Sequence, residues 1–221
     1  LICTTGDEFW HAAGRIAEGR HWFRVTLAAN DNAPALLRGW AMSLAGMLAM
    51  TQSDFAEARR LLLGALAIHG PADNEHWRFK IVHELGWLAY VIADEHEARL
   101  RFAQALEISR ALNSPFSTAQ AHHALGCIAS AYDRDYERAE CLFDEATMLF
   151  KQCGRMDLCT EVLFHICELR LYTNELESAH AGLIELKALS DHFPERLHGW
   201  YASGLTEVNI MTGRPRDALP H

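Results

Sequence analysis

Long apolar runs and clusters of basic residues are both missing from this chain of 221 residues. The longest apolar stretches reach about nine residues, as from Leu85 to Ala93, whereas a membrane-spanning helix needs about 20. Lysine and arginine number 20 against 29 acidic residues, so the net charge is −9. Because a phosphate backbone is bound by clustered basic side chains, we expect neither direct nucleic-acid binding by this segment nor membrane association.

The six cysteines include no Cys-x-x-Cys pair, the spacing typical of zinc and redox sites. Most of them fall inside helical patterns, which favours reduced, buried thiols and a cytoplasmic protein without a secretory signal. The alternative is a zinc site at Cys153, Cys159 and Cys167, but that spacing fits no common zinc motif. We therefore expect no metal ligands.

Sequence signatures of catalysis are also absent or weak. There is no Gly-x-x-x-x-Gly-Lys-Ser/Thr loop to bind phosphate, and His83-Glu84 lacks the second histidine of a helical metalloprotease site. His122 and His123 are adjacent and therefore point to different faces of a helix. A cysteine–histidine nucleophile needs only spatial neighbours, so the sequence leaves it open. The expected protein is non-catalytic and binds no cofactor.

What the sequence does contain is a unit of about 40 residues that recurs. Each unit has a small residue followed four and seven positions later by apolar or small residues. The copies are Ala58-Leu62-Ala65, Ala98-Phe102-Ala105 and Ala139-Phe143-Ala146, the weaker Gly19-Phe23-Thr26 and Ala179-Leu183-Leu186, and one beginning at Ala218. A fixed period of this length predicts stacked helical hairpins, each contacting its neighbours.

The repeat predicts one solenoid over residues 1–221, with no strand-like alternation of useful length. The approximate units are 1–33, 34–73, 74–113, 114–155, 156–194 and an incomplete 195–221. Because residue 1 is not methionine and the last unit is cut short, we interpret the chain as part of a longer protein.

Glycine and helix-start residues refine the hairpins. Gly46, Gly86 and Gly126 recur in the middle of the first helix of three units, although glycine there costs about 1 kcal/mol relative to alanine. This recurrence predicts that the second helix approaches the backbone of the first helix closely. Aspartate or asparagine followed three residues later by glutamate predicts helix N-caps. These caps are Asp54, Asp94 and Asn174. Ser114-Pro115 is predicted to begin another helix, and 32–34 is predicted to interrupt the helical pattern between the first two units.

These positions resemble the tetratricopeptide repeat (TPR). The third unit matches best, at Val82, Leu85, Gly86, Ala98, Phe102 and Ala105. The period exceeds the common 34 residues, and we expect the extra residues between hairpins, as in 110–115 and 151–156. This long form, and the residue patterns at 14–19 and 135–139, are similar to the sensor arrays of bacterial signal-transduction ATPases that often end in a LuxR-type helix-turn-helix.

The resemblance implies an all-α, right-handed superhelical solenoid of TPR-like hairpins. It also implies a ligand- or protein-binding sensor of a cytoplasmic bacterial transcription regulator, which releases its ATPase when an inducer or partner binds. The alternative is a constitutive scaffold or adaptor that recruits a partner without switching.

The concave face of such an array is lined by the first helix of each hairpin. A groove rich in aromatic, methionine and histidine side chains suits a protein or peptide partner, or a small-molecule inducer. The expected groove residues are Trp40, Met47, Lys80, His83, Trp87, Tyr90, His123, Cys127, Phe164 and Glu168. The lysine and asparagine clamp that holds heat-shock chaperone tails is absent from the corresponding positions, such as Ser43 and Met47, so we expect no such partner.

Overall fold

The computed structural model describes residues 10, 14–29, 33–69, 74–190 and 206, and these ranges form an all-α structure. Clustering of backbone contacts divides the chain into two compact units, Leu1–Ser114 and Pro115–His221. Each unit consists of helices that pack in the order in which they follow one another along the chain. Among the described helices, none is both long and apolar enough to cross a membrane.

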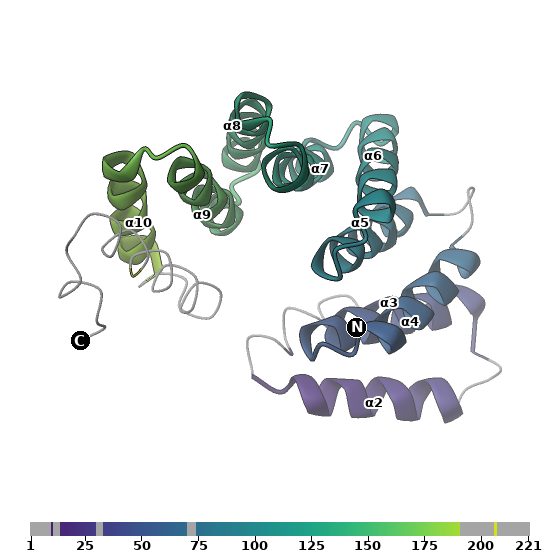
Figure 1. The fold of residues 1–221 in the computed structure, drawn as a ribbon. Helices are drawn as coiled ribbons and strands as arrows, with labels where there is room; N and C mark the ends of the chain where they lie inside the picture. Colours follow the sequence, from purple (N-terminus) through teal and green to yellow (C-terminus); the bar gives the residue numbers. More distant parts are fainter. Residues whose placement is uncertain (1–9, 11–13, 30–32, 70–73, 191–205, 207–221) are drawn as a thin grey trace. The chain divides into compact units, whose positions relative to one another are not determined.

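Unit 1 contains five described helices (Figure 1). They are α2 (Ile16–Ala29), α3 (Ala35–Thr51), α4 (Phe55–Ile68), α5 (Glu75–Val91) and α6 (Glu95–Ala111). The pairs α3–α4 and α5–α6 form helical hairpins, and α2 and α4 pack against the helix that follows each of them.

Unit 2 continues the same pattern (Figure 1). Its described elements are α7 (Pro115–Ile128), the π-helical turn η1 (Ala129–Asp133), α8 (Tyr136–Gln152), α9 (Met156–Tyr172) and α10 (Leu176–Ser190). Here α7 pairs with α8 and α9 pairs with α10, while α8 packs against α9.

The repeated small and apolar residues form the interior of each hairpin, as the sequence predicts. In the four hairpins every member of the triads is at most 1% exposed. The glycines of the first helix face the phenylalanine rings of the second helix. A Cβ on Gly86 would overlap the Phe102 ring, and one on Gly126 would lie 2.5 Å from Phe143 Cε1. The predicted close approach is confirmed. In α2, Phe23 is buried but Thr26 is exposed, in keeping with a weaker copy.

Short turns with one repeated backbone conformation join the helices. In six of these turns the residue two positions before the next helix adopts a positive φ; these residues are Ser53, Ala93, Asn113, Arg134, Gly154 and Asn174. Asp54 and Asp94 then accept hydrogen bonds from the backbone N–H of Glu57 and Glu97, at 3.4 and 3.2 Å. These two predicted caps are confirmed, and α7 begins at Pro115 as expected.

Two local predictions are wrong. Asn174 is not an N-cap: it occupies the left-handed position, which asparagine tolerates better than most residues, and α10 begins two residues later at Leu176. The residues beyond 34 per unit do not form long connections, because α6 runs to Ala111 and α8 to Gln152. They lengthen the helices instead, so that several reach 17 residues.

The π-helical turn η1 accounts for an irregular spacing in the sequence. Ala98 lies 12 positions after Gly86, but Ala139 lies 13 positions after Gly126. The widened turn takes up the additional residue, and Asp135 N–H bonds to Ala129 C=O at 3.0 Å where Asp94 N–H bonds to Ala89 C=O. The register of the next helix is thereby kept. The sixth unit, with Ala218, lies outside the described residues except for Thr206. Of the break at 32–34, Ala33 and Pro34 are described and directly precede α3.

Candidate functional site

Two predicted groove residues, Trp40 of α3 and Lys80 of α5, belong to an aromatic stack. Trp40 packs on Trp77 with ring centroids 5.4 Å apart, and both flank His69. Lys80 Nζ lies 5.6 Å from the centre of the Trp77 ring, a cation–π arrangement. Met47, by contrast, is buried in the apolar core beside Phe23 and Leu48 rather than in this stack.

A second group lies further along α5. Trp87 Nε1 donates a hydrogen bond to His83 Nε2 at 3.2 Å, and its ring packs edge-on against Tyr90 and Phe102. His83 is buried, whereas Trp87 and Tyr90 keep part of their surface accessible. These three predicted residues are therefore brought together on one helix and rest on the core of the α5–α6 hairpin.

The four predicted residues of unit 2 meet around a histidine that the sequence analysis did not select. His165 of α9 has its ring 5.1 Å from that of His123, and its Nδ1 lies 2.8 Å from Glu168 Oε2. Cys127 follows His123 by one helical turn and faces the same point. Phe164 packs edge-on against the His165 ring. Burial acts to lower the pKa of His165, but Cys127 and Glu168 outweigh it and raise that pKa.

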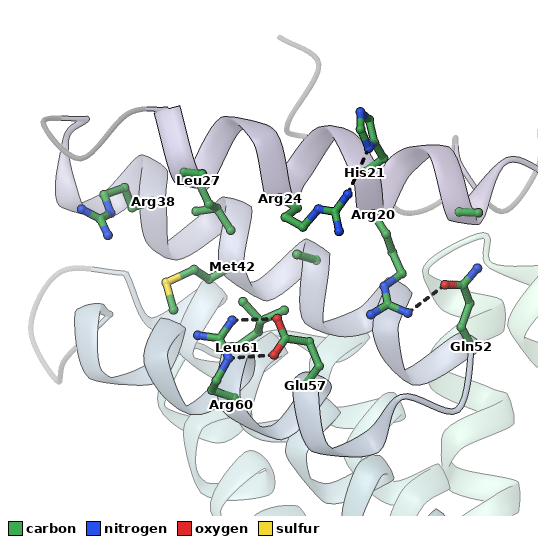
Figure 2. A pocket seen from close by; sticks show the side chains of 13 residues that line it. Arg20, His21, Arg24, Leu27, Arg38, Met42, Gln52, Glu57, Arg60 and Leu61 are labelled. Carbon is green, nitrogen blue, oxygen red and sulfur yellow. Dashed lines mark hydrogen bonds and ion pairs between the residues drawn. The ribbon is translucent and has the colours of Figure 1, made fainter.

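A cleft of about 620 Å³ opens in unit 1 and is lined mainly by residues of α2, α3 and α4 (Figure 2). Its charged lining is mostly basic: Arg20 and Arg24 from α2, Arg38 from α3 and Arg60 from α4, against Glu57. Apolar residues Leu27, Met42 and Leu61 complete much of the wall. We call this feature the arginine cleft.

Hydrogen bonds hold several of these guanidinium groups in place (Figure 2). Arg60 binds Glu57 through two bonds of 2.7 Å, and Arg20 spans to Gln52 and Asp54 at 2.8 and 2.5 Å. Arg24 donates to His21 Nδ1 at 3.3 Å. The bonded arginine in each pair lowers the pKa of the Asp54 and Glu57 carboxyl groups, so both stay ionised.

The charge balance of the cleft is opposite to that of the whole chain. Four arginines stand against Glu57 and the neighbouring Asp54, which leaves two positive charges in excess on a chain of net charge −9. Arginine binds carboxylates and phosphates through paired N–H donors, and the volume lies within the usual range for ligand sites. The arrangement can therefore bind an anionic group flanked by apolar contacts.

Sequence reasoning missed this cleft because its residues come from three helices and do not form a basic run. Arg20 and its partners Gln52 and Asp54 are 32 and 34 positions apart. The sequence predicts a groove along the first helix of each hairpin instead, and none of the predicted groove residues lines this cleft.

The fold defines a class: the chain is a TPR-like array of helical hairpins. Apo RapI superposes with a TM-score of 0.76 at 12% identity, over 98% of this chain and 80% of RapI. A signal transduction ATPase with a tetratricopeptide repeat sensor from Pyrococcus horikoshii gives 0.73 at 14% identity, over 97% of this chain but 32% of the ATPase. BtubC from P. vanneervenii gives 0.64 at 19% identity, over 97% and 87%.

Because these identities are low, the likeness establishes the fold alone. At the level of sequence, no protein-family model and no curated protein matches the chain significantly.

Proposed function

We propose that this chain is the ligand- or protein-binding sensor of a cytoplasmic bacterial transcription regulator, that it is non-catalytic, and that the arginine cleft binds an acidic peptide segment. The observation that carries the proposal is the cleft itself, with four guanidinium groups at one site of an acidic chain. Acidic side chains of a peptide would meet the arginines, and its apolar side chains would contact Leu27, Met42 and Leu61.

The regulatory part of the proposal is supported by the fold and by the sequence resemblance. Two of the similar structures are RapI and an ATPase that carries a tetratricopeptide repeat sensor. A sensor differs from a scaffold in one physical respect: its ligand must prefer one arrangement of the array over another.

The aromatic face predicted from the sequence is proposed as a second contact surface. Trp87 and Tyr90 remain partly accessible on α5, and partly exposed aromatic rings are frequent anchors for peptide partners. Because Trp87 also packs on Phe102, replacing both rings by alanine tests this surface only if helicity and thermal stability are measured on the same sample.

Binding of fluorescent acidic and basic peptides of equal length tests the cleft. We expect the glutamate-rich peptide to bind with an affinity that falls as salt rises, and the lysine-rich peptide not to bind. Arg24→Glu should weaken binding about tenfold or more, equivalent to about 1.4 kcal/mol. Arg59→Glu is the matched control, because Arg59 is exposed on α4 but does not line the cleft. Equal affinities for the two variants would contradict the proposed site.

Hydrogen exchange with and without the acidic peptide separates a sensor from a scaffold. A sensor is expected to change exchange at helices that do not line the cleft, such as α9 and α10, because the ligand shifts the whole array. Protection confined to α2, α3 and α4 would instead indicate a constitutive adaptor.

A further inference from the structure

Three potential metal ligands converge inside unit 2. His123 and Cys127 lie one turn apart on α7, and His165 reaches them from α9. One ligand atom from each residue lies within 4.8 Å of the other two. We call this group the thiol–imidazole cluster. His123 and Cys127 are 7% and 2% exposed, and the His165 side chain is 21% exposed, so the cluster is enclosed on the α7 side and accessible beside His165.

The spacing of the cluster is close to that of a tetrahedral zinc site. With Zn–S near 2.3 Å and Zn–N near 2.0–2.1 Å, ligand atoms around a tetrahedral ion lie about 3.3–3.6 Å apart. The separations here, at most 4.8 Å, exceed those values by no more than about 1.2–1.5 Å, a difference that rotations about side-chain torsions can remove. A thiolate with two imidazoles is a donor set that suits Zn²⁺ and leaves a fourth coordination position open.

Glu168 supplies the outer support that metal-bound histidines usually have. Its Oε2 lies 2.8 Å from His165 Nδ1, so that nitrogen is engaged and Nε2 remains for an ion. A carboxylate in this position fixes the tautomer and orientation of the ring and increases its basicity. The Phe143 ring stacks on His165 with centroids 6.1 Å apart, which further restricts the imidazole.

The polypeptide around the cluster departs from the regular repeat. The π-helical turn η1 begins at Ala129, two residues after Cys127, and π-helical turns of this kind frequently occur at functional sites. The repeat positions of His123 and Cys127 are occupied in the preceding unit by His83 and Trp87, which hydrogen-bond to each other. The fourth unit thus has a thiol where the third has an indole.

The same side chains also resemble a cysteine nucleophile with a histidine base and an orienting glutamate. Two observations favour a metal site. Cys127 is 2% exposed, so its sulfur is not accessible to the reacting carbonyl of a substrate. A thiol–imidazole nucleophile has no role for a second imidazole, whereas His123 completes a ligand set.

We propose that His123, Cys127 and His165 bind one Zn²⁺ ion, with Glu168 as the positioning residue of His165 and the fourth coordination position open toward solvent. The ion would tie α7 to α9 across two successive hairpins and displace the protons that the thiol and imidazole carry without it. This site is independent of the arginine cleft, and it is an alternative to the expectation from sequence that no residue of this chain is a metal ligand.

Cobalt substitution tests the site, because Co²⁺ replaces Zn²⁺ in tetrahedral sites and reports its ligands by absorption. The reduced protein, stripped with a chelator, is titrated with Co²⁺ alone and then with Zn²⁺. We expect one equivalent of Co²⁺ to give visible bands of tetrahedral cobalt and a near-ultraviolet thiolate-to-cobalt band, and Zn²⁺ to remove both. Cobalt bound without the thiolate band would indicate surface histidines and overturn the proposal, as would no binding.

Matched variants assign the ligands. Cys127→Ser should abolish the thiolate band, whereas Cys167→Ser should retain it, because Cys167 is also buried but packs with α10 rather than with the cluster. Likewise His123→Gln should weaken binding and His122→Gln should not, since His122 pairs with Glu145 on α8. Identical titrations of Cys127→Ser and Cys167→Ser would refute the assignment.

Glu168→Gln gives a second test that does not disturb the core, because the Glu168 side chain is 38% exposed. We expect the near-ultraviolet band to persist while the dissociation constant for Zn²⁺ rises about 10–100-fold, the usual effect of losing a partner of a metal-bound histidine. An unchanged dissociation constant would show that Glu168 does not position His165 for an ion. Circular dichroism of each variant confirms that the helices are retained.

Discussion

Replacement of Gly86 by alanine should destabilise the α5–α6 hairpin, against the ordinary preference of helices for alanine. A Cβ at this position would overlap Cε1 of the Phe102 ring and lie 2.5 Å from its Cδ1. Phe102 is fully buried, and the centroids of the His83 and Trp87 rings lie 6.0 and 5.3 Å from the centroid of its ring, so these neighbours restrict its movement.

The magnitude follows from two opposing contributions. Alanine gains about 1 kcal/mol of helix propensity over glycine, whereas overpacking a buried site costs about 1–3 kcal/mol. Since the overlap is with a ring held on several sides, we take the upper end of the cost and expect a net loss of about 1–2 kcal/mol. For a chain of this size that lowers the melting temperature by roughly 2–8 °C.

Gly64→Ala is the matched control, because Gly64 also lies inside a helix of unit 1. A Cβ there would overlap only the terminal methyl of Met42, a flexible side chain that can rotate away. We expect this variant to be neutral or stabilised by up to about 1 kcal/mol.

Thermal and urea unfolding followed by circular dichroism measures both variants. Combining Gly86→Ala with Phe102→Leu should show a favourable coupling energy, because the smaller side chain relieves part of the overlap. Equal stabilisation by alanine at both glycines would refute the explanation of the repeated glycine.

Three further predictions concern unit 1. Burial lowers the pKa of His69, so below the unfolded-state value of about 6.5 the unfolded chain binds more protons than the folded chain. The unfolding free energy should therefore be retained above that pH and fall on acidification, by at most about 1.4 kcal/mol per pH unit. His69→Phe should reduce this slope, measured by urea titrations at pH 7.5 and 5.5. Ala93→Gly should raise the unfolding free energy by about 1 kcal/mol, because Ala93 holds φ at 58° and alanine is disfavoured there; no gain would argue against the left-handed turn. Asp94→Ala should lower the unfolding free energy by about 1 kcal/mol by removing the cap on Glu97 N–H, while Asp94→Asn should retain most of the capping stabilisation. Equal losses of unfolding free energy in the two variants would indicate that capping is unimportant there.

The hairpins could be predicted from sequence because the features that define them are local. Ala98, Phe102 and Ala105 lie on one face of a single helix, and Gly86 is identified by its fixed spacing from them. Asp54 and Asp94 act on backbone groups three residues away. The position of the residues beyond 34 per unit was mispredicted, because the segments 110–115 and 151–156 are equally compatible with loops and with exposed helix ends.

The sites could not be predicted in the same way, because they depend on contacts between helices. His123 and Cys127 of α7 were predicted from their helix position, but His165 of α9 was not. Arg20 and Arg60 belong to helices that α3 separates. A repeat pattern gives the face of each helix that packs inward, but it does not specify which side chains meet between neighbouring hairpins.

The packing of each helix mainly on its neighbours in sequence has a consequence for how the chain is made. A ribosome adds about 5–20 residues per second, so a hairpin of about 40 residues takes roughly 2–8 s to emerge. Helical structures dominated by local contacts fold in microseconds to milliseconds. We therefore expect each hairpin to be complete before the next is synthesised, so that the array grows from its N-terminal end and exposes at any moment the apolar face of only its newest hairpin.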